Sequence, residues 1–110
     1  LNAYTAEADR PVPFRNMIYI GDGLTDVPTM KLVKESGGSS IAVHTERTRP
    51  VAHRLMNEGR INYYAPADYR EGSELCTLVK TILEMLGPQN RLEYEASRMR
   101  LDALDSRLHQ

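Results

Sequence analysis

The sequence predicts an α/β fold with a Rossmann-like parallel sheet, and three features of its patterning support this class. Short apolar runs rich in β-branched and aromatic residues alternate with stretches whose apolar residues recur at helical spacing. The connections between these segments are short, which favours right-handed crossovers between neighbouring parallel strands. The first apolar run is unbroken rather than alternating, as is typical of a parallel strand covered on both faces.

Three strands and two intervening helices are expected in the first part of the chain. Residues 1–15 form an irregular N-terminal segment, because Pro11 and Pro13 favour extended backbone. Gly37-Gly38 follow the first helix as a C-cap would. The expected elements occupy residues 16–20 (strand), Pro28 to about Ser36 (helix), 40–43 (strand), Pro50 to Glu58 (helix) and 61–64 (strand).

A further helix is expected after Ser73, which is a typical N-cap residue. Its apolar positions recur at helical spacing and comprise Leu75, Leu78, Val79, Ile82, Leu83 and Leu86. Gly87-Pro88 predicts the end of this helix, so the α/β core is expected to cover residues 16–87.

Residues 88–110 are predicted to form a separate amphipathic helix. A helix of this length is only marginally stable alone in water. Its apolar face is therefore expected to pack against another protein surface. Three surfaces are left open for this docking: its own domain, a second subunit and another domain of the full protein. The residues that share this face are Tyr94, Leu101, Leu104 and Leu108.

The turn after the first strand carries two carboxylates close together. Asp22 lies in a Gly-Asp-Gly turn, Asp26 follows four residues later, and Pro28 marks a helix start. The carboxyl end of a parallel strand is where open α/β sheets bind ligands. Two neighbouring carboxylates repel each other unless a cation is present, and Mg²⁺ takes one or two carboxylates with water and phosphate oxygens.

A dinucleotide-binding fingerprint is a poor interpretation of this loop. Gly21-x-Gly23 follows a strand and precedes a helix, but Asp26 stands where the third glycine belongs. Asp22 lies inside the loop, and both carboxylates would repel a pyrophosphate from the backbone amides.

Two further interpretations explain less of the loop. An EF-hand calcium loop starting at Asp22 does not fit the sequence at three positions. Leu24 stands where the motif needs an acid or amide, Val27 where it needs glycine, and Val33 where it needs glutamate. A plain turn with Asp26 as helix cap explains one carboxylate but not the other beside it.

The run from Asn16 to Pro28, NMIYIGDGLTDVP, resembles the last signature motif of the haloacid dehalogenase-like (HAD) hydrolases. The resemblance extends over about residues 11–87 and is most specific in the acidic loop. It implies Mg²⁺-dependent phosphoryl transfer to an aspartate, followed by hydrolysis of the aspartyl-phosphate. Asp22 would be a metal ligand, and Asp26 would bind the ion or hold its water shell. Gly21 and Gly23 would allow the tight backbone path.

The nucleophile of that family belongs to an Asp-x-Asp pair on an earlier strand, and no Asp-x-Asp occurs in this sequence. We therefore assign no catalytic residue within the chain and expect the nucleophile upstream. On this interpretation the chain is the C-terminal part of a larger phosphatase, with an incomplete sheet, and is inactive alone. The alternative is a non-catalytic association module that uses the half-fold and the tail helix.

Thr25 and Asp68 are candidates for the substrate side of the site, with a turn or cap role as the alternative for Asp68. The basic segment 44–60 is expected to be a solvated surface. A small phosphorylated molecule is the expected substrate, although the sequence does not identify it.

Composition narrows the class of protein further. Fourteen Lys and Arg balance fifteen Asp and Glu, which disfavours a nucleic-acid or membrane-surface binder. The apolar runs are too short to span a bilayer. The single cysteine, Cys76, is expected to be buried packing and suits a reducing compartment such as the cytoplasm.

Overall fold

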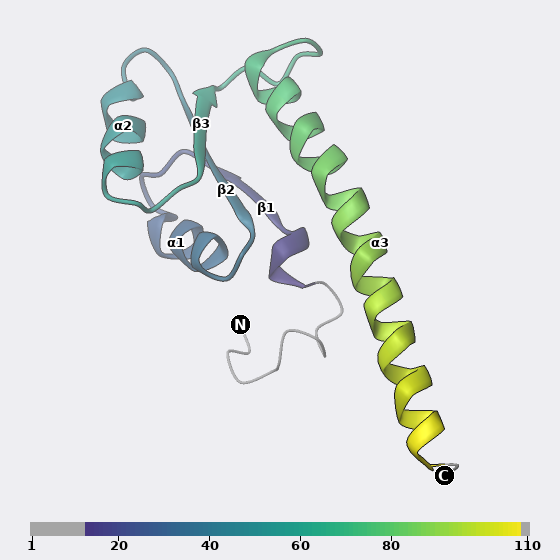
Figure 1. Cartoon of the computed structure of the whole chain (residues 1–110). Helices are drawn as coiled ribbons and strands as arrows, with labels where there is room; N and C mark the ends of the chain where they lie inside the picture. The colour runs from purple at the N-terminus through teal and green to yellow at the C-terminus, as the bar shows by residue number, and fades with distance from the viewer. Residues whose placement is uncertain (1–12, 109–110) are drawn as a thin grey trace. The chain divides into compact units, whose positions relative to one another are not determined.

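A computed structural model describes residues 13–108 and contains a three-stranded parallel sheet in the order β1-β2-β3 (Figure 1). This confirms the predicted α/β class with a parallel sheet. Residues 1–12 of the expected N-terminal segment, and residues 109–110 of the tail, lie outside the described part. The elements are a 3₁₀ helix (Phe14–Asn16), β1 (Ile18–Gly21), α1 (Val27–Glu35), β2 (Ser39–His44), α2 (Arg49–Asn57), β3 (Tyr63–Pro66) and α3 (Glu74–Leu108).

The chain divides into two compact units, Leu1–Thr77 and Leu78–Gln110. The described part of the first unit holds the sheet, α1, α2 and the first turn of α3. The described part of the second unit is the remainder of α3, a single helix.

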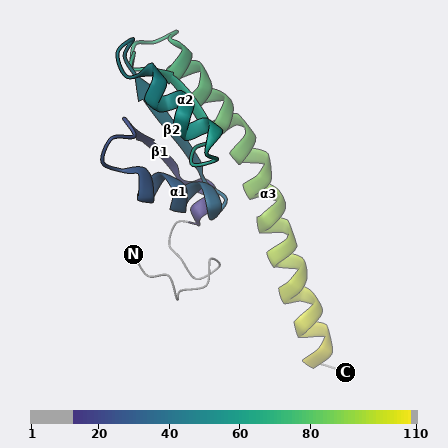
Figure 2. The ribbon, with the colours of Figure 1, turned by 90° about the vertical axis from the view of Figure 1, so that its left-hand side faces the viewer.

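Helices α1 and α2 cover the same face of the sheet. Both connect parallel neighbours in a sheet whose spatial order follows the chain order, and right-handed crossovers then place both helices on one side. Both lie in front of the sheet in Figure 2. α1 packs on β1 and β2, and α2 packs on β2 and β3.

The core of the first unit lies between these helices and the sheet. Burying each of its Met, Leu and Ile side chains contributes about 1.5–3 kcal/mol. The buried Ser40 hydroxyl adds a polar link, donating a hydrogen bond to the Met30 carbonyl at 2.5 Å. The central buried cluster consists of Met30, Ala42, Ala52, Leu55 and Ile61.

The expected element boundaries are close to those observed, with two shifts. The first strand begins at Ile18 rather than residue 16, because residues 14–16 form a 3₁₀ turn after Pro13. The third strand begins at Tyr63 rather than residue 61. Ile61 is buried in the core, but sheet pairing starts only after it.

The predicted helix caps at Gly37-Gly38 and at Ser73 are confirmed. Gly37 has a φ of 97°, and its amide donates to Lys34 while Gly38 donates to Val33, which closes the end of α1. Ser73 accepts the Cys76 amide through its hydroxyl oxygen at 3.1 Å, which caps the start of α3. Cys76 itself is free and half-buried, so the expectation of full burial is wrong.

The prediction that Gly87-Pro88 ends a helix is wrong, because α3 continues through both residues to Leu108. A proline inside a helix removes one hydrogen bond and costs about 3 kcal/mol. Long runs of helix-forming residues lie on both sides of it, and the costly nucleation step is needed once. The expected core and tail helices are therefore one helix.

Within residues 13–108, no helix is long and apolar enough to cross a membrane.

Candidate metal-binding loop

The acidic loop lies at the carboxyl edge of the sheet. β1 ends at Gly21, residues 22–26 form the loop, and α1 begins at Val27. Since all three strands are parallel, the loops after β2 and β3 open at the same edge. The position expected from the sequence is therefore the one observed.

Asp26 points back into the loop rather than capping α1. Its Oδ1 accepts the Gly23 amide at 3.0 Å, and its Oδ2 accepts the Tyr19 hydroxyl at 3.4 Å. No side-chain cap hydrogen bond from Asp26 to α1 is formed. The carboxylate thus joins the end of β1 to the turn that follows it.

Two glycines are required by this geometry. A Cβ at position 21 would lie 1.8 Å from Asp26 Oδ2, so any side chain there displaces the carboxylate. Gly23 has a φ of 76°, and a Cβ there would lie 2.4 Å from Leu55 Cδ1. The loop is therefore held between β1 and α2.

Asp22 is exposed at the start of the loop. Its Oδ1 accepts the Leu24 amide at 2.9 Å, an arrangement typical of an Asx turn. Asp26 has both oxygens engaged within the loop, whereas Asp22 faces solvent. Of the two carboxylates, Asp22 is the better placed to meet an ion.

The electrostatic effect of both carboxylates reaches Tyr19. Burial raises the pKa of the Tyr19 hydroxyl, and the negative charge of Asp26, the hydrogen bond to it and the charge of Asp22 raise it further. The phenol stays protonated at neutral pH and can donate to Asp26. The two carboxylates are thus close enough to act on one group.

Asp22 and Asp26 are the carboxylates of this loop that could meet a metal ion. Within residues 13–108 there is no group of three or more His, Cys, Asp or Glu side chains suited to a metal. Mg²⁺ is commonly held by one or two carboxylates, with water and substrate phosphate completing the octahedron. Asp22 would hold such an ion, and Asp26 would fix the loop that presents it.

The other two candidate residues lie apart from this pair. Thr25 is exposed between the two carboxylates. Asp68 follows β3, a strand that lies two positions from β1 in the sheet and so about 10 Å from it at normal strand spacing. Arg70 binds Asp68 with its amide at 3.0 Å and its guanidinium at 2.8 and 2.9 Å, which is the turn role left open by the sequence. These hydrogen bonds lower the pKa of Asp68 to about 2.

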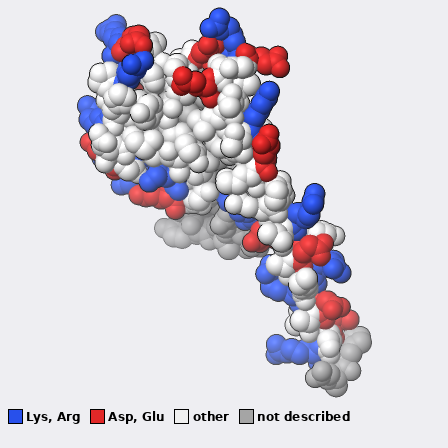
Figure 3. Space-filling view, turned by 45° about the horizontal axis from the view of Figure 1, so that its top comes forward, with Lys and Arg blue, Asp and Glu red and all other residues white. Residues whose placement is uncertain are grey.

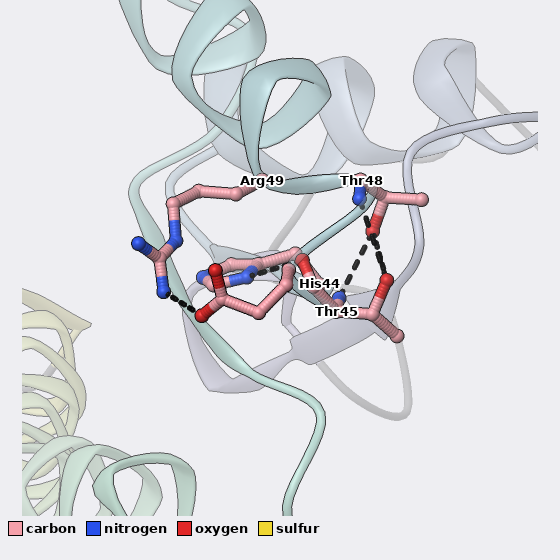
Figure 4. Close-up of polar contacts among 5 residues, drawn as sticks. His44, Thr45, Thr48 and Arg49 are labelled. Atoms are coloured by element: carbon pink, nitrogen blue, oxygen red, sulfur yellow. Dashed lines mark hydrogen bonds and ion pairs between the residues drawn. The ribbon is translucent and has the colours of Figure 1, made fainter.

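A second polar cluster follows β2 (Figure 4). His44 is buried, and its Nδ1 lies 3.1 Å from the Thr45 carbonyl oxygen and donates to it. Thr45 and Thr48 exchange backbone-to-hydroxyl hydrogen bonds, and Arg49 pairs with Glu46. The expectation that segment 44–60 is simply solvated is therefore wrong at His44.

This cluster borders a cavity of about 270 Å³ that includes His44, Arg49, His53 and Tyr64 in its lining. The acidic loop contacts the side of α2 that carries Leu55, whereas the cavity contacts the side that carries Arg49 and His53. The cavity is slightly smaller than usual for small-molecule sites, and both signs of charge surround it.

Sequence reasoning missed two partners of the loop, Tyr19 and Leu55. Tyr19 precedes Gly21 by two residues, so the strand period places both on one face, and this signal was available. The approach of Leu55 to Gly23 depends on how α2 packs, which no local pattern reveals.

Comparison with known proteins gives one informative match. The chain is 30% identical over 82 residues to an uncharacterized protein of Borreliella burgdorferi, an alignment that covers 68% of this chain. The chain spans 27% of the length of that relative. No protein-family profile and no solved structure matches the chain.

Proposed function

We propose that the chain is the C-terminal part of a HAD-like, Mg²⁺-dependent phosphohydrolase that works in the cytoplasm on a small phosphorylated substrate. The observation that carries the proposal is the loop Gly21–Asp26 at the carboxyl end of β1, where Gly21 leaves space for Asp26. The resemblance of NMIYIGDGLTDVP to the HAD motif supplies the chemistry.

In this proposal the residues of the chain present and hold a metal ion. Asp22 would bind Mg²⁺, which would neutralise phosphate charge as the phosphoryl group is transferred. Asp26, held by Gly23 and Tyr19, would keep the loop in the required conformation. Preorganised ligands matter because no reorganisation is then needed during reaction.

The nucleophile would come from outside residues 13–108. Among these residues β1 pairs only with β2, so its other edge is open to a further strand. A parallel strand added there would end beside Gly21, and an aspartate at its end would lie near Asp22.

Hydrolysis of a phosphate monoester such as p-nitrophenyl phosphate tests the proposal. The 110-residue chain alone should be inactive, and a longer protein containing it should show Mg²⁺-dependent activity. Asp22→Asn in the longer protein should lower kcat/KM by more than about 100-fold, because an orienting ligand of the metal is lost. Full activity of the isolated chain, or of the Asp22→Asn protein, would overturn the proposal.

A second candidate, a non-catalytic association module, is favoured by exposed apolar side chains on α3. Asp22→Asn separates the two candidates. It should weaken Mg²⁺ binding without changing assembly if the chain belongs to a hydrolase. A change in oligomer size with unchanged Mg²⁺ affinity would favour the association module.

A further inference from the structure

The C-terminal half of α3 carries large apolar side chains at heptad spacing. Tyr94 and Leu101 are seven residues apart, and Ser97 and Leu104 fill the alternate positions, which gives an a/d pattern. Tyr94, Leu101 and Leu104 are 67%, 68% and 50% exposed. The described part of the second unit is one helix, so no other element within it covers this seam.

The charges that flank the seam are complementary in a parallel pair of identical helices. In such a pair each g position faces the e position five residues later in the other copy. Glu93 then faces Arg98, and Arg100 faces Asp105. By symmetry each contact occurs twice. Figure 3 shows basic and acidic side chains interspersed along this helix.

The antiparallel arrangement is disfavoured by the same residues. Antiparallel helices bring e positions opposite e positions and g positions opposite g positions. Aligning Tyr94 with Leu104 then sets Arg98 against Arg98 and Arg100 against Arg100. The same alignment sets the opposite charges Glu93 and Arg107, and Arg91 and Asp105, against each other. Like charges in direct opposition are repulsive. The parallel pair has attractive contacts without these like-charge contacts, so the charge pattern favours the parallel orientation.

The opposite side of the helix offers a poorer seam. Leu92 and Met99 are 71% and 61% exposed there, but the alternate positions are Ala96 and Ala103. Alanine buries little apolar area, and coiled coils gain most of their stability from large a and d residues.

We propose that residues 90–108 of α3 pair in parallel with the same segment of a second copy, through Tyr94, Ser97, Leu101 and Leu104. The partner is a second copy because the flanking charges of the helix complement themselves. The seam is short, so the dimer is weak and concentration-dependent. This inference does not depend on the proposed hydrolase activity.

Sedimentation of the 110-residue chain over a range of concentrations tests the seam. Leu101→Glu should raise the dimer dissociation constant by about tenfold or more, because it places a charge in the seam. Met99→Glu is the matched control, since it changes an equally exposed apolar residue on the opposite side. A chain that stays monomeric, or loss of the dimer with Met99→Glu alone, would overturn the proposal.

Charge reversal tests the identity of the partner. Glu93→Arg should weaken the dimer, and adding Arg98→Glu should restore it, because the reversed residues again face opposite charges. A double variant no stronger than Glu93→Arg would contradict pairing with a second copy.

Cross-linking tests the orientation. In a Cys76→Ala background, Ser97→Cys should form a disulfide dimer on mild oxidation, because in-register d positions face each other in a parallel pair. Ser106→Cys, on the outer side of the helix, is the control and should cross-link much less. Equal cross-linking of the two would argue against the parallel seam.

Discussion

The side chain of Asp26 organises the acidic loop because its two oxygens bind groups on both sides of the turn. One accepts the Gly23 amide and the other accepts the Tyr19 hydroxyl. The carboxylate fits only because residue 21 has no side chain. The residues Tyr19, Gly21 and Asp26 thus depend on one another. This dependence explains why Asp26 follows the Gly-Asp-Gly turn at this spacing.

Gly21→Ala should disrupt the loop. The new methyl group would overlap Asp26 Oδ2, and relieving such overpacking typically costs about 1–3 kcal/mol. Urea denaturation should show the loss of stability, and Mg²⁺ binding should fall with it. Gly72→Ala is the control, because its φ of 84° makes alanine strained there too, so it should lower stability away from the loop and leave Mg²⁺ binding unchanged.

The pKa of Asp68 is a second prediction at this scale. Arg70 lowers it to about 2 from 3.8, so the pair favours the folded chain above about pH 4 and this contribution is lost as pH falls through about 2. Carboxyl ¹³C NMR should record this titration, and Arg70→Ala should move the pKa toward 3.8. An unchanged Asp68 titration in Arg70→Ala would show that the ion pair is absent in solution.

At the scale of the element, local signals predicted the ends of helices better than their continuation. The cap at Gly37 and the cap at Ser73 each depend on residues within one turn, so the sequence was sufficient. The path of α3 through Pro88 depends on the helix propensities of many residues on both sides of it. The prediction gave too much weight to one helix-breaking residue. β1 began late because the 3₁₀ turn at Phe14 competes with the strand.

Pro88→Ala tests the continuous α3. Within a helix, alanine is more favourable than proline by about 3 kcal/mol, so the amides around residue 88 should exchange more slowly with solvent. Because α3 runs through residue 88, alanine there can donate the helical hydrogen bond that proline cannot. Unchanged or faster exchange would instead indicate a helix that ends at Pro88.

At the scale of the whole molecule, the parallel sheet explains why the acidic loop was placed correctly from sequence. Crossover topology puts every loop that follows a strand at one edge, so Asp22 had to lie at the carboxyl edge. The turn role of Asp68 could not be decided in advance, because it depends on Arg70 folding back onto it. The cavity beside His44 could not be predicted from the sequence either, because residues of both α2 and β3 line it.

Among residues 13–108, β1 pairs with a strand on one edge only, and its other edge carries the most specific functional implication of the fold. A sheet edge at the strand that bears the acidic loop is where a nucleophile-bearing strand would pair in the proposed hydrolase. The chain alone would then bind the metal but not turn over substrate. Metal binding and catalysis should therefore be separable.

The most direct test is a Mg²⁺ titration of the 110-residue chain followed by amide NMR, in the wild type and in Asp22→Asn. The account predicts weak, saturable shifts concentrated at Gly21–Asp26, with Tyr19 responding through Asp26, and loss of these shifts in Asp22→Asn. Shifts that are absent in the wild type, or that persist unchanged in Asp22→Asn, would contradict the assignment of the loop as a metal site.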